Sequence, residues 1–228
     1  MFVQYPFNSL LYFLFHNIIL LHKALIVKIK ALVDTKQIKS AAIIGAGFIG
    51  VELAENLRHR GIKTTIVEFR DNILPQFDPE MIEPMQKVLI ENGIELALSA
   101  ETETVNESTL TLKDGRVIDA DLVVAAIGVV ADHKLAVDTG LEIGDAGGIV
   151  VDDQMRTSDP NVFAVGDAAQ KVSALTGQDQ MIWLANLANR HGRLVADVIA
   201  GETVAARPSI GTGIIGAFGM AAALTGLT

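Results

Sequence analysis

Residues 40–61 of the chain read SAAIIGAGFIGVELAENLRHRG, and they decide the fold. The stretch contains a G-x-G-x-x-G pattern at Gly45, Gly47 and Gly50, between an apolar run and a helical pattern. In such a strand, turn and helix, the first glycine permits the turn, the second lets a pyrophosphate approach, and the third lets the helix pack on the sheet. The helix N-terminus presents unpaired N–H groups to the phosphates. The pattern therefore predicts an α/β fold that binds a dinucleotide, with a plain strand–turn–helix as the alternative.

An acidic residue lies where such a fold holds the adenosine ribose. A β-branched strand over 63–69 ends near Glu68, which follows Gly50 by 18 positions. A carboxylate there accepts hydrogen bonds from the ribose hydroxyls and repels a 2′-phosphate, so we expect NAD rather than NADP. Arg70 and two further arginines nearby would favour such a phosphate, and NADP remains the alternative.

The other segments alternate between strand and helix patterns, as in an α/β domain. Asp78 and Pro79 suit a helix N-cap and the first helical position. Asp114-Gly115 is a hairpin signal, and the apolar run ending at Gly128 is typical of a strand buried on both faces. In chain order, we expect a helix over 23–36, a strand over 41–44, a helix over 51–60, a strand over 63–69, a helix over 78–93, a strand over 94–98, a hairpin over 108–119, strands over 120–128 and 162–165, and a helix over 182–200.

The composition excludes several classes of protein. The chain has 228 residues, a formal net charge of −9 and a pI of about 5.0. This balance argues against a nucleic-acid binder, which would carry a basic face. The chain has no cysteine, so a disulfide, a thiolate metal site and a redox thiol within it are excluded. Its five histidines show no metal-ligand spacing, and we expect no metal site.

Both ends of the chain are uncharged. The first 22 residues contain no Asp, Glu, Lys or Arg, whereas a secretory signal would need a basic n-region. His16 and Asn17 split their apolar runs, so we favour a buried or ill-fitting segment of a cytoplasmic protein over a membrane anchor. The tail from Ser209 onward is uncharged too, and exposed apolar ends would favour self-association.

Four motifs in order resemble a known family: GAGFIGVELAENLRHRG at 45–61, DADLVVAAIG at 119–128, TSDPNVFAVGDAA at 157–169 and ANRHGRLVADVIAG at 188–201. The chain is similar to the FAD-dependent pyridine nucleotide-disulfide oxidoreductases, in the branch of CoA-disulfide reductases, NADH oxidases and NADH peroxidases. The resemblance implies a Rossmann-like NAD(P)-binding domain inserted in a partial second nucleotide-binding domain, for FAD. The implied divisions are an atypical N-terminal segment over 1–39, an NADH domain over 40–150, the C-terminal half of the FAD domain over 151–207, and the start of an interface domain over 208–228.

The resemblance also implies roles for individual residues. It implies that NADH is contacted by the glycine loop, including Ile49, and by Gly128. It also implies that Phe48 lies over the flavin and moves when nicotinamide arrives. Glu52 matches a glutamate that pairs with a lysine beside the flavin. The implied FAD contacts are Gly166, Asp167, Leu184 and Ala185. Asp167 would accept a hydrogen bond from the ribityl chain, and its alternative role is the N-cap of a helix that begins at Ala168.

The chain departs from the family pattern in the features that carry the chemistry. It has no second glycine-rich loop for the ADP part of FAD, no redox cysteine and no matching lysine partner for Glu52. We therefore expect an incomplete chain, truncated or disrupted, of an enzyme that passes electrons from NADH through FAD to a disulfide, peroxide or oxygen. By itself, this chain is expected to bind NADH weakly, to purify without FAD and to show no turnover. The alternatives are a non-catalytic NAD-binding remnant and a membrane-associated NADH–quinone oxidoreductase.

Overall fold

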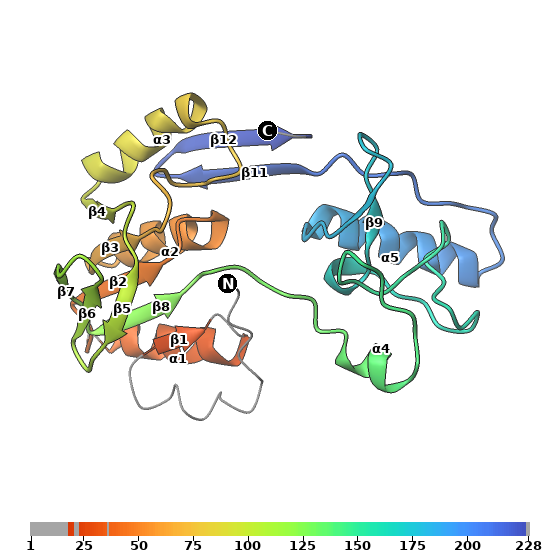
Figure 1. Cartoon of the computed structure of the whole chain (residues 1–228), viewed down its shortest axis with the longest axis horizontal. Helices are drawn as coiled ribbons and strands as arrows, with labels where there is room; N and C mark the ends of the chain where they lie inside the picture. Colours follow the sequence, from red (N-terminus) through yellow and green to blue (C-terminus); the bar gives the residue numbers. More distant parts are fainter. Residues whose placement is uncertain (1–17, 21–22, 36, 227–228) are drawn as a thin grey trace. The chain divides into compact units, whose positions relative to one another are not determined.

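The computed structural model describes residues 18–20, 23–35 and 37–226, and these form two compact units (Figure 1). The N-terminal unit comprises the described residues up to Gly128 together with Ile214–Ala222. The C-terminal unit comprises Val129–Gly213 and the described residues from Ala223 onward. Most of the uncharged start of the chain lies outside the described residues, so its expected character stays a prediction. Among the described residues, no helix is long and apolar enough to cross a membrane.

A five-stranded parallel sheet forms the centre of the N-terminal unit. Its strands, in spatial order, are β1 (Ile18–Leu20), β8 (Leu122–Ala125), β2 (Ser40–Ile44), β3 (Lys63–Val67) and β4 (Ile94–Ala97). The predicted strands of this sheet are confirmed, although β3 ends at Val67 and not at Phe69. Strand β1 was not predicted, because a three-residue apolar segment carries no periodicity of its own.

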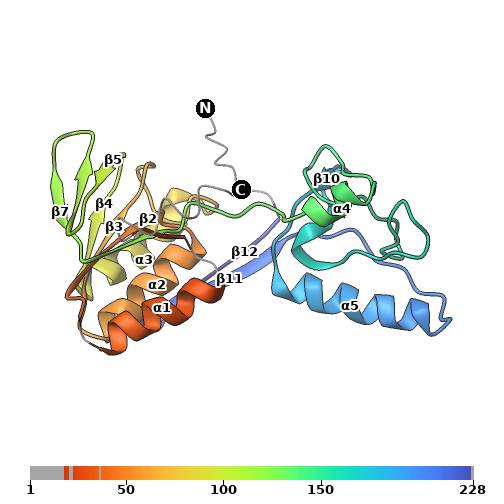
Figure 2. The same ribbon diagram turned by 90° about the horizontal axis from the view of Figure 1, so that it is seen from below.

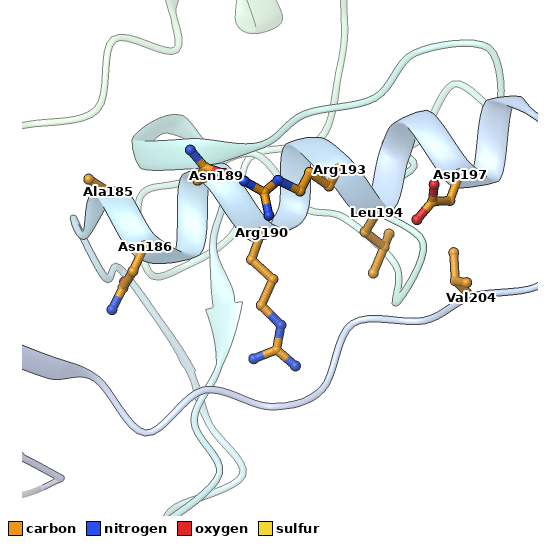
Figure 3. A pocket seen from close by; sticks show the side chains of 8 residues that line it. All are labelled: Ala185, Asn186, Asn189, Arg190, Arg193, Leu194, Asp197 and Val204. Carbon is orange, nitrogen blue, oxygen red and sulfur yellow. The ribbon is translucent and has the colours of Figure 1, made fainter.

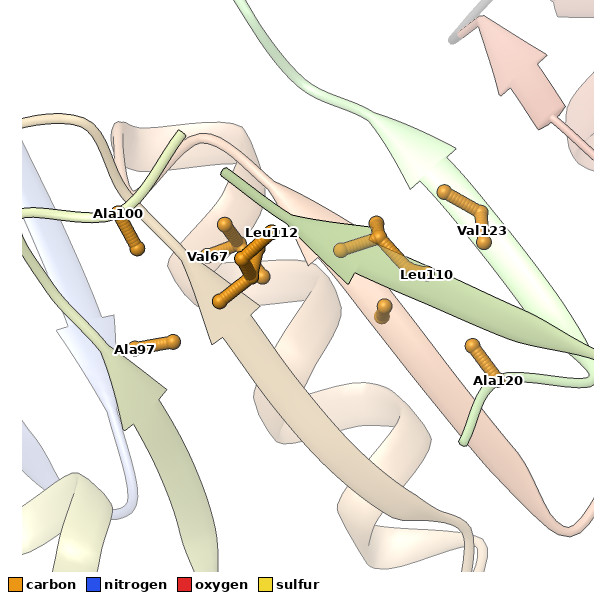
Figure 4. Close-up of a cluster of buried hydrophobic side chains, with 8 residues drawn as sticks. Val67, Ala97, Ala100, Leu110, Leu112, Ala120 and Val123 are labelled. Carbon is orange, nitrogen blue, oxygen red and sulfur yellow. The ribbon is translucent and has the colours of Figure 1, made fainter. Parts of the chain in front are cut away.

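The two faces of this sheet are covered differently. Helices α2 (Phe48–His59) and α3 (Pro79–Glu91) lie on one face, and the antiparallel strands β5 (Thr102–Val105), β6 (Thr109–Leu112) and β7 (Val117–Asp119) lie on the other (Figure 2). Side chains of β6 and of the parallel sheet meet in one apolar cluster (Figure 4). Its buried members are Ala42, Val67, Ala97, Ala100, Leu110, Leu112, Ala120 and Val123.

The helix boundaries are close to those expected from local sequence. Helix α1 (Lys23–Asp34) ends two positions before the predicted Lys36. Asp78 is the N-cap of α3 as predicted, but its side chain makes no capping hydrogen bond. At the other end of α3, Nε of Arg58 donates to the carbonyl of Asn92 at 2.9 Å, which satisfies one of the carbonyls left free there.

The C-terminal unit has little regular structure. It contains α4 (Lys134–Asp138), the short strands β9 (Lys171–Val172) and β10 (Asp179–Gln180), and α5 (Ala185–Ile199). The strand predicted over 162–165 is wrong. Phe163 forms only an isolated bridge with Arg156, because this segment pairs with the adjacent loop instead of joining a sheet.

The predicted uncharged tail folds as a hairpin. Strands β11 (Thr212–Ala217) and β12 (Met220–Thr225) pair with each other. Phe218 and Gly219 connect them, with φ of 49° and 79°, as a two-residue hairpin turn requires. The amide of Phe218 donates to Oε1 of Glu55 on α2 at 2.7 Å. The assignment of this tail to an interface domain stays a prediction, as do the other predicted domain boundaries.

Candidate functional site

Two glycines of the loop at 45–50 are required by packing. Gly45 has a φ of +104°, and an ideal Cβ there would lie 2.5 Å from the carbonyl oxygen of Ala126. A Cβ at Gly50 would lie 2.0 Å from the carbonyl oxygen of Gly45. Both distances are far below van der Waals contact, so the turn and the close approach of α2 need glycine at these positions.

Gly47 differs from its neighbours because its Cβ position is open. It is the N-cap of α2, with a φ of −74°, and an ideal Cβ there meets no atom within 4 Å. No side chain caps the helix at this end. Among the described residues, no side chain therefore competes for the first N–H groups of α2, as binding of a phosphate group at a helix N-terminus requires.

Glu68 is held next to this loop by backbone hydrogen bonds. The amide of Ala46 donates to its Oε2 at 2.7 Å, and the amide of Arg70 donates to its Oε1 at 2.9 Å. The carboxylate is half-buried and directly follows β3. Each oxygen keeps a lone pair beyond these bonds, so the group is oriented and still able to accept hydrogen bonds from a ligand.

The remaining predicted NADH residues lie on the same edge of the sheet. Gly128, with a φ of +107°, follows β8, and the contact between Gly45 and Ala126 joins the loops after β2 and β8. Phe48 begins α2 and packs edge-on against Phe77, with ring centroids 6.0 Å apart. Ile49 is 45% exposed. This is the carboxyl edge of a parallel sheet, where open α/β folds bind ligands.

Glu52 has no lysine beside it in the described part of the chain. Its side chain is exposed on α2, and its carbonyl accepts a hydrogen bond from the Asn56 amide at 2.8 Å. The carboxylate forms no ion pair there, so its expected role depends on a partner that these residues do not supply.

The predicted FAD residues come together in the C-terminal unit. Gly166, with a φ of +75°, begins a 3₁₀ turn, η3 (Gly166–Ala168), and its ideal Cβ would lie 3.5 Å from Cβ of Ala188 on α5. Leu184 is the N-cap of α5, and Ala185 is its first residue.

Asp167 does not cap an α-helix. It lies inside η3, its side chain is exposed, and no side-chain capping bond forms there. The alternative role as the N-cap of a helix beginning at Ala168 is therefore wrong. The chain turns back after three residues, because Ala169 adopts an extended conformation and Gln170 pairs with Ile149.

An open groove runs along α5 from its first residue (Figure 3). Its volume is about 800 Å³. Asn186, Arg190 and Leu194 project from the same side of the helix. The lining residues are Ala185, Asn186, Asn189, Arg190, Arg193, Leu194, Asp197 and Val204.

Sequence reasoning missed the buried polar residues behind η3. Lys171 is 5% exposed and His191 is 4% exposed, although both types are usually found at the surface. Burial lowers the pKa of Lys171, and burial together with Lys171 and Arg190 lowers the pKa of His191. No spacing in the sequence marks these residues as buried, because the segments that cover them are distant in the chain.

The chain resembles known proteins over most of its length. The sequence model of the family described as pyridine nucleotide-disulphide oxidoreductase matches residues 18–192. An NADH oxidase of Methanocaldococcus jannaschii is 36% identical over 167 residues, which cover 72% of this chain and 37% of that protein. A coenzyme A disulfide reductase of Staphylococcus aureus is 29% identical over 184 residues, covering 80% of this chain and 42% of that protein.

Solved structures give the same result. Reduced CoADR-RHD of Bacillus anthracis superposes with a TM-score of 0.88 and 37% identity, covering 93% of this chain and 39% of that one. The chain therefore spans about two-fifths of the length of these relatives. The family uses FAD and NAD(P)H as cofactors, and the glycine loop and Glu68 described above fit a dinucleotide. The chain belongs to the pyridine nucleotide-disulphide oxidoreductase family, whose members are flavin-dependent enzymes.

Proposed function

We propose that this chain supplies the NADH site of a flavin-dependent oxidoreductase. The observation that carries the proposal is the junction of Gly47 and Glu68. An open N–H cradle at the start of α2 lies beside a carboxylate that the amide of Ala46 orients at 2.7 Å. A dinucleotide joins a pyrophosphate to a ribose, which are the groups that these two features bind, and the named relatives include an NADH oxidase.

In this proposal, each of these residues at the carboxyl edge of the parallel sheet has one task. The first N–H groups of α2 bind the pyrophosphate across Gly47, and Glu68 accepts hydrogen bonds from the ribose hydroxyls. Gly128 leaves room for the nicotinamide half, and Phe48 limits access of water to the reacting face. These residues do no chemistry themselves. They bind and orient the cofactor, so that hydride transfer needs little further ordering.

The C-terminal unit offers part of a flavin site. Asp167 would accept a hydrogen bond from a ribityl hydroxyl, while Gly166 leaves room for that chain. Leu184 and Ala185, at the start of α5, would lie beside the ring. FAD, when bound, accepts a hydride from NADH and passes electrons to an acceptor. A reaction with a disulfide that uses a protein thiol would need that thiol from outside these 228 residues, because they contain no cysteine.

A second candidate function is NAD binding without catalysis. Two observations favour it: the absence of cysteine, and the exposed Glu52 with no ion pair in the described residues. The absorbance of the purified chain near 450 nm (about the flavin maximum) separates the two functions. A stoichiometric flavin band supports the oxidoreductase, and a colourless chain that binds NADH supports the remnant. Self-association of the chain stays a prediction.

The Gly47→Val variant tests the NADH site. A Cβ there meets no other residue within 4 Å, and the added methyl groups should fill the phosphate cradle, so we expect a folded variant whose NADH binding is weaker by tenfold or more, about 1.4 kcal/mol. Isothermal titration calorimetry measures the NADH affinity of the variant and of the unmodified chain. Gly192→Ala on α5 is the matched control, since a Cβ there also meets nothing within 4 Å. Equal NADH affinity in a folded Gly47→Val variant would contradict the proposal.

A further inference from the structure

Lys171 is a buried cation behind the turn that carries Asp167. It begins β9, and 5% of its surface is exposed. Its ammonium group donates hydrogen bonds to the carbonyl oxygen of Gly166 and, at 2.6 Å, to that of Ala169. These two carbonyls lie on either side of Asp167 and Ala168, so one side chain ties the two ends of η3 together.

The backbone hydrogen bonds of η3 join its two ends less strongly than the side chain of Lys171 does. The amide of Ile149 donates to the carbonyl of Ala168 at 2.8 Å, which fixes the outer side of the turn. The amide of Ala169 reaches the carbonyl of Gly166 at 3.4 Å, which is long for an N–H···O bond. The lysine therefore supplies the stronger bonds at the point where the chain reverses.

The surroundings of Lys171 do not neutralise its charge by contact. In the part of the chain that the structure describes, no carboxylate oxygen lies within 4 Å of its Nζ. His191, the buried neighbour on α5, has a pKa lowered by burial and by Lys171. Among nearby carboxylates, Asp167 opposes the effect of burial on the pKa of Lys171. Asp167 is thus exposed on the turn whose two end carbonyls hold the buried Lys171 ammonium group.

A buried cation is costly unless it performs a task that a smaller or apolar side chain cannot. A methionine would fill similar space here without the cost of removing a charge from water. The lysine provides what methionine lacks: a charged donor group that reaches two backbone carbonyls at once.

We propose that Lys171 is a positioning residue for Asp167. It holds η3 in one conformation and so fixes the position of the carboxylate that accepts a hydrogen bond from a polyol hydroxyl of the ligand. This inference rests on the proposed flavin role of Asp167. It adds a residue of β9 that makes no contact with the ligand itself.

Amide hydrogen exchange of the whole chain tests the inference. Lys171→Met should raise exchange at Ile149, Ala169 and Gln170 on the order of tenfold, because the turn loses its charge-assisted bonds. Lys171→Arg keeps the cation and should retain most of the protection. Lys134→Met, at an exposed lysine of α4, is the control and should change nothing at the turn.

The outcomes are distinct. Unchanged exchange at the turn in Lys171→Met overturns the inference. Equal loss of protection throughout α5 also overturns it, since it marks a general structural role. A loss of protection at the turn that is as large in Lys171→Arg as in Lys171→Met also overturns the inference. Fluorescence titration with FAD is the second readout, and Lys171→Met should weaken any binding by tenfold or more. If the unmodified chain binds no FAD, the proposed flavin role fails, while the exchange result still decides whether Lys171 orders the turn.

Discussion

At the scale of single residues, the glycines of one motif have different physical roles. Gly45 and Gly50 are required because a Cβ would overlap backbone atoms at 2.5 and 2.0 Å. Gly47 has no such neighbour, and its conformation suits any residue. Its value lies in the space that it leaves for a ligand. Within these six positions, Gly45 and Gly50 therefore serve stability, and Gly47 serves the proposed binding of the cofactor.

That separation predicts opposite behaviour for two alanine variants. Gly50→Ala should destabilise the N-terminal unit by about 1–3 kcal/mol, because α2 must move away from the loop. Gly47→Ala should leave its stability within about 0.5 kcal/mol of the original. Urea denaturation followed by circular dichroism measures both. A Gly50→Ala variant as stable as the unmodified chain would contradict the packing found here.

Glu68 should set the choice between the two nicotinamide cofactors. NADH should bind about tenfold or more tightly than NADPH, since a lost charged hydrogen bond and added repulsion are worth ~1.5–3 kcal/mol. Glu68→Ala should reduce this ratio of affinities, because the repulsion is removed and the neighbouring Arg70 attracts the 2′-phosphate. Calorimetric titration with each cofactor measures the ratio, and Glu91→Ala on the exposed face of α3 is the control. Equal affinities in the unmodified chain would rule the idea out.

At the scale of elements, one carboxylate joins the starts of two neighbouring strands. Oδ2 of Asp121, just before β8, accepts the amides of Lys39 at 2.8 Å and Ser40 at 3.0 Å. The amide of Asp121 in turn donates to Oγ of Ser40 at 3.1 Å. The hydrogen bond from the Lys39 amide, followed by those from Ser40, lowers the pKa of Asp121. The bonds fix the register between β2 and β8 at the edge opposite the glycine loop.

Asp121→Ala should therefore destabilise the N-terminal unit by about 1–3 kcal/mol, because two amides lose their acceptor. The pKa of Asp121 is lower in the folded chain than in the unfolded one. Its contribution is then complete above the ordinary aspartate pKa of about 3.9 and is lost as the pH falls below it. Denaturation at pH 7 and at pH 3 measures the effect, which should shrink at pH 3. Asp119→Ala, at an exposed neighbour, is the control, and an effect independent of pH would contradict the assignment.

At the scale of the whole molecule, the two units have different interiors. The N-terminal unit buries a continuous apolar core between its sheet and the covering layers. The C-terminal unit buries many polar groups. Its buried polar residues are Thr157, Gln170, Lys171, Ser173, His191 and Ser209. Buried polar groups contribute less net stability per residue than apolar ones, so the two units should respond differently to the same conditions.

NADH should consequently stabilise one unit selectively. A ligand that binds only the folded N-terminal unit raises its unfolding free energy by about 2.7 kcal/mol at one hundred times the dissociation constant. Hydrogen exchange should slow in β2, β3 and β8 and stay constant in α5. Gly47→Val supplies the control, because tenfold weaker binding at the same NADH concentration should reduce the stabilisation to about 1.4 kcal/mol or less. Equal protection of both units would show that the cofactor acts on the whole chain.

Local sequence was sufficient for much of the N-terminal unit. The strands and helices around the glycine loop were predicted because each carries its own periodicity, its own stop and its own turn residues. The hairpin at Asp114-Gly115 was predicted for the same reason. These features depend on residues within a few positions of one another. The placement of Glu68 after a strand also follows from spacing alone.

Contacts between distant segments were decided only by the tertiary structure. The addition of β1 to the sheet, the third antiparallel strand β5 and the bond from Ala46 to Glu68 depend on which segments meet in space. The same holds for the burial of Lys171 and for the turn at Asp167, where an apolar run suggested a strand. Sequence determined the local conformations and the residue types available at the site. Burial and pairing, which arise only when remote segments exclude water together, decided which of those residues are oriented to act.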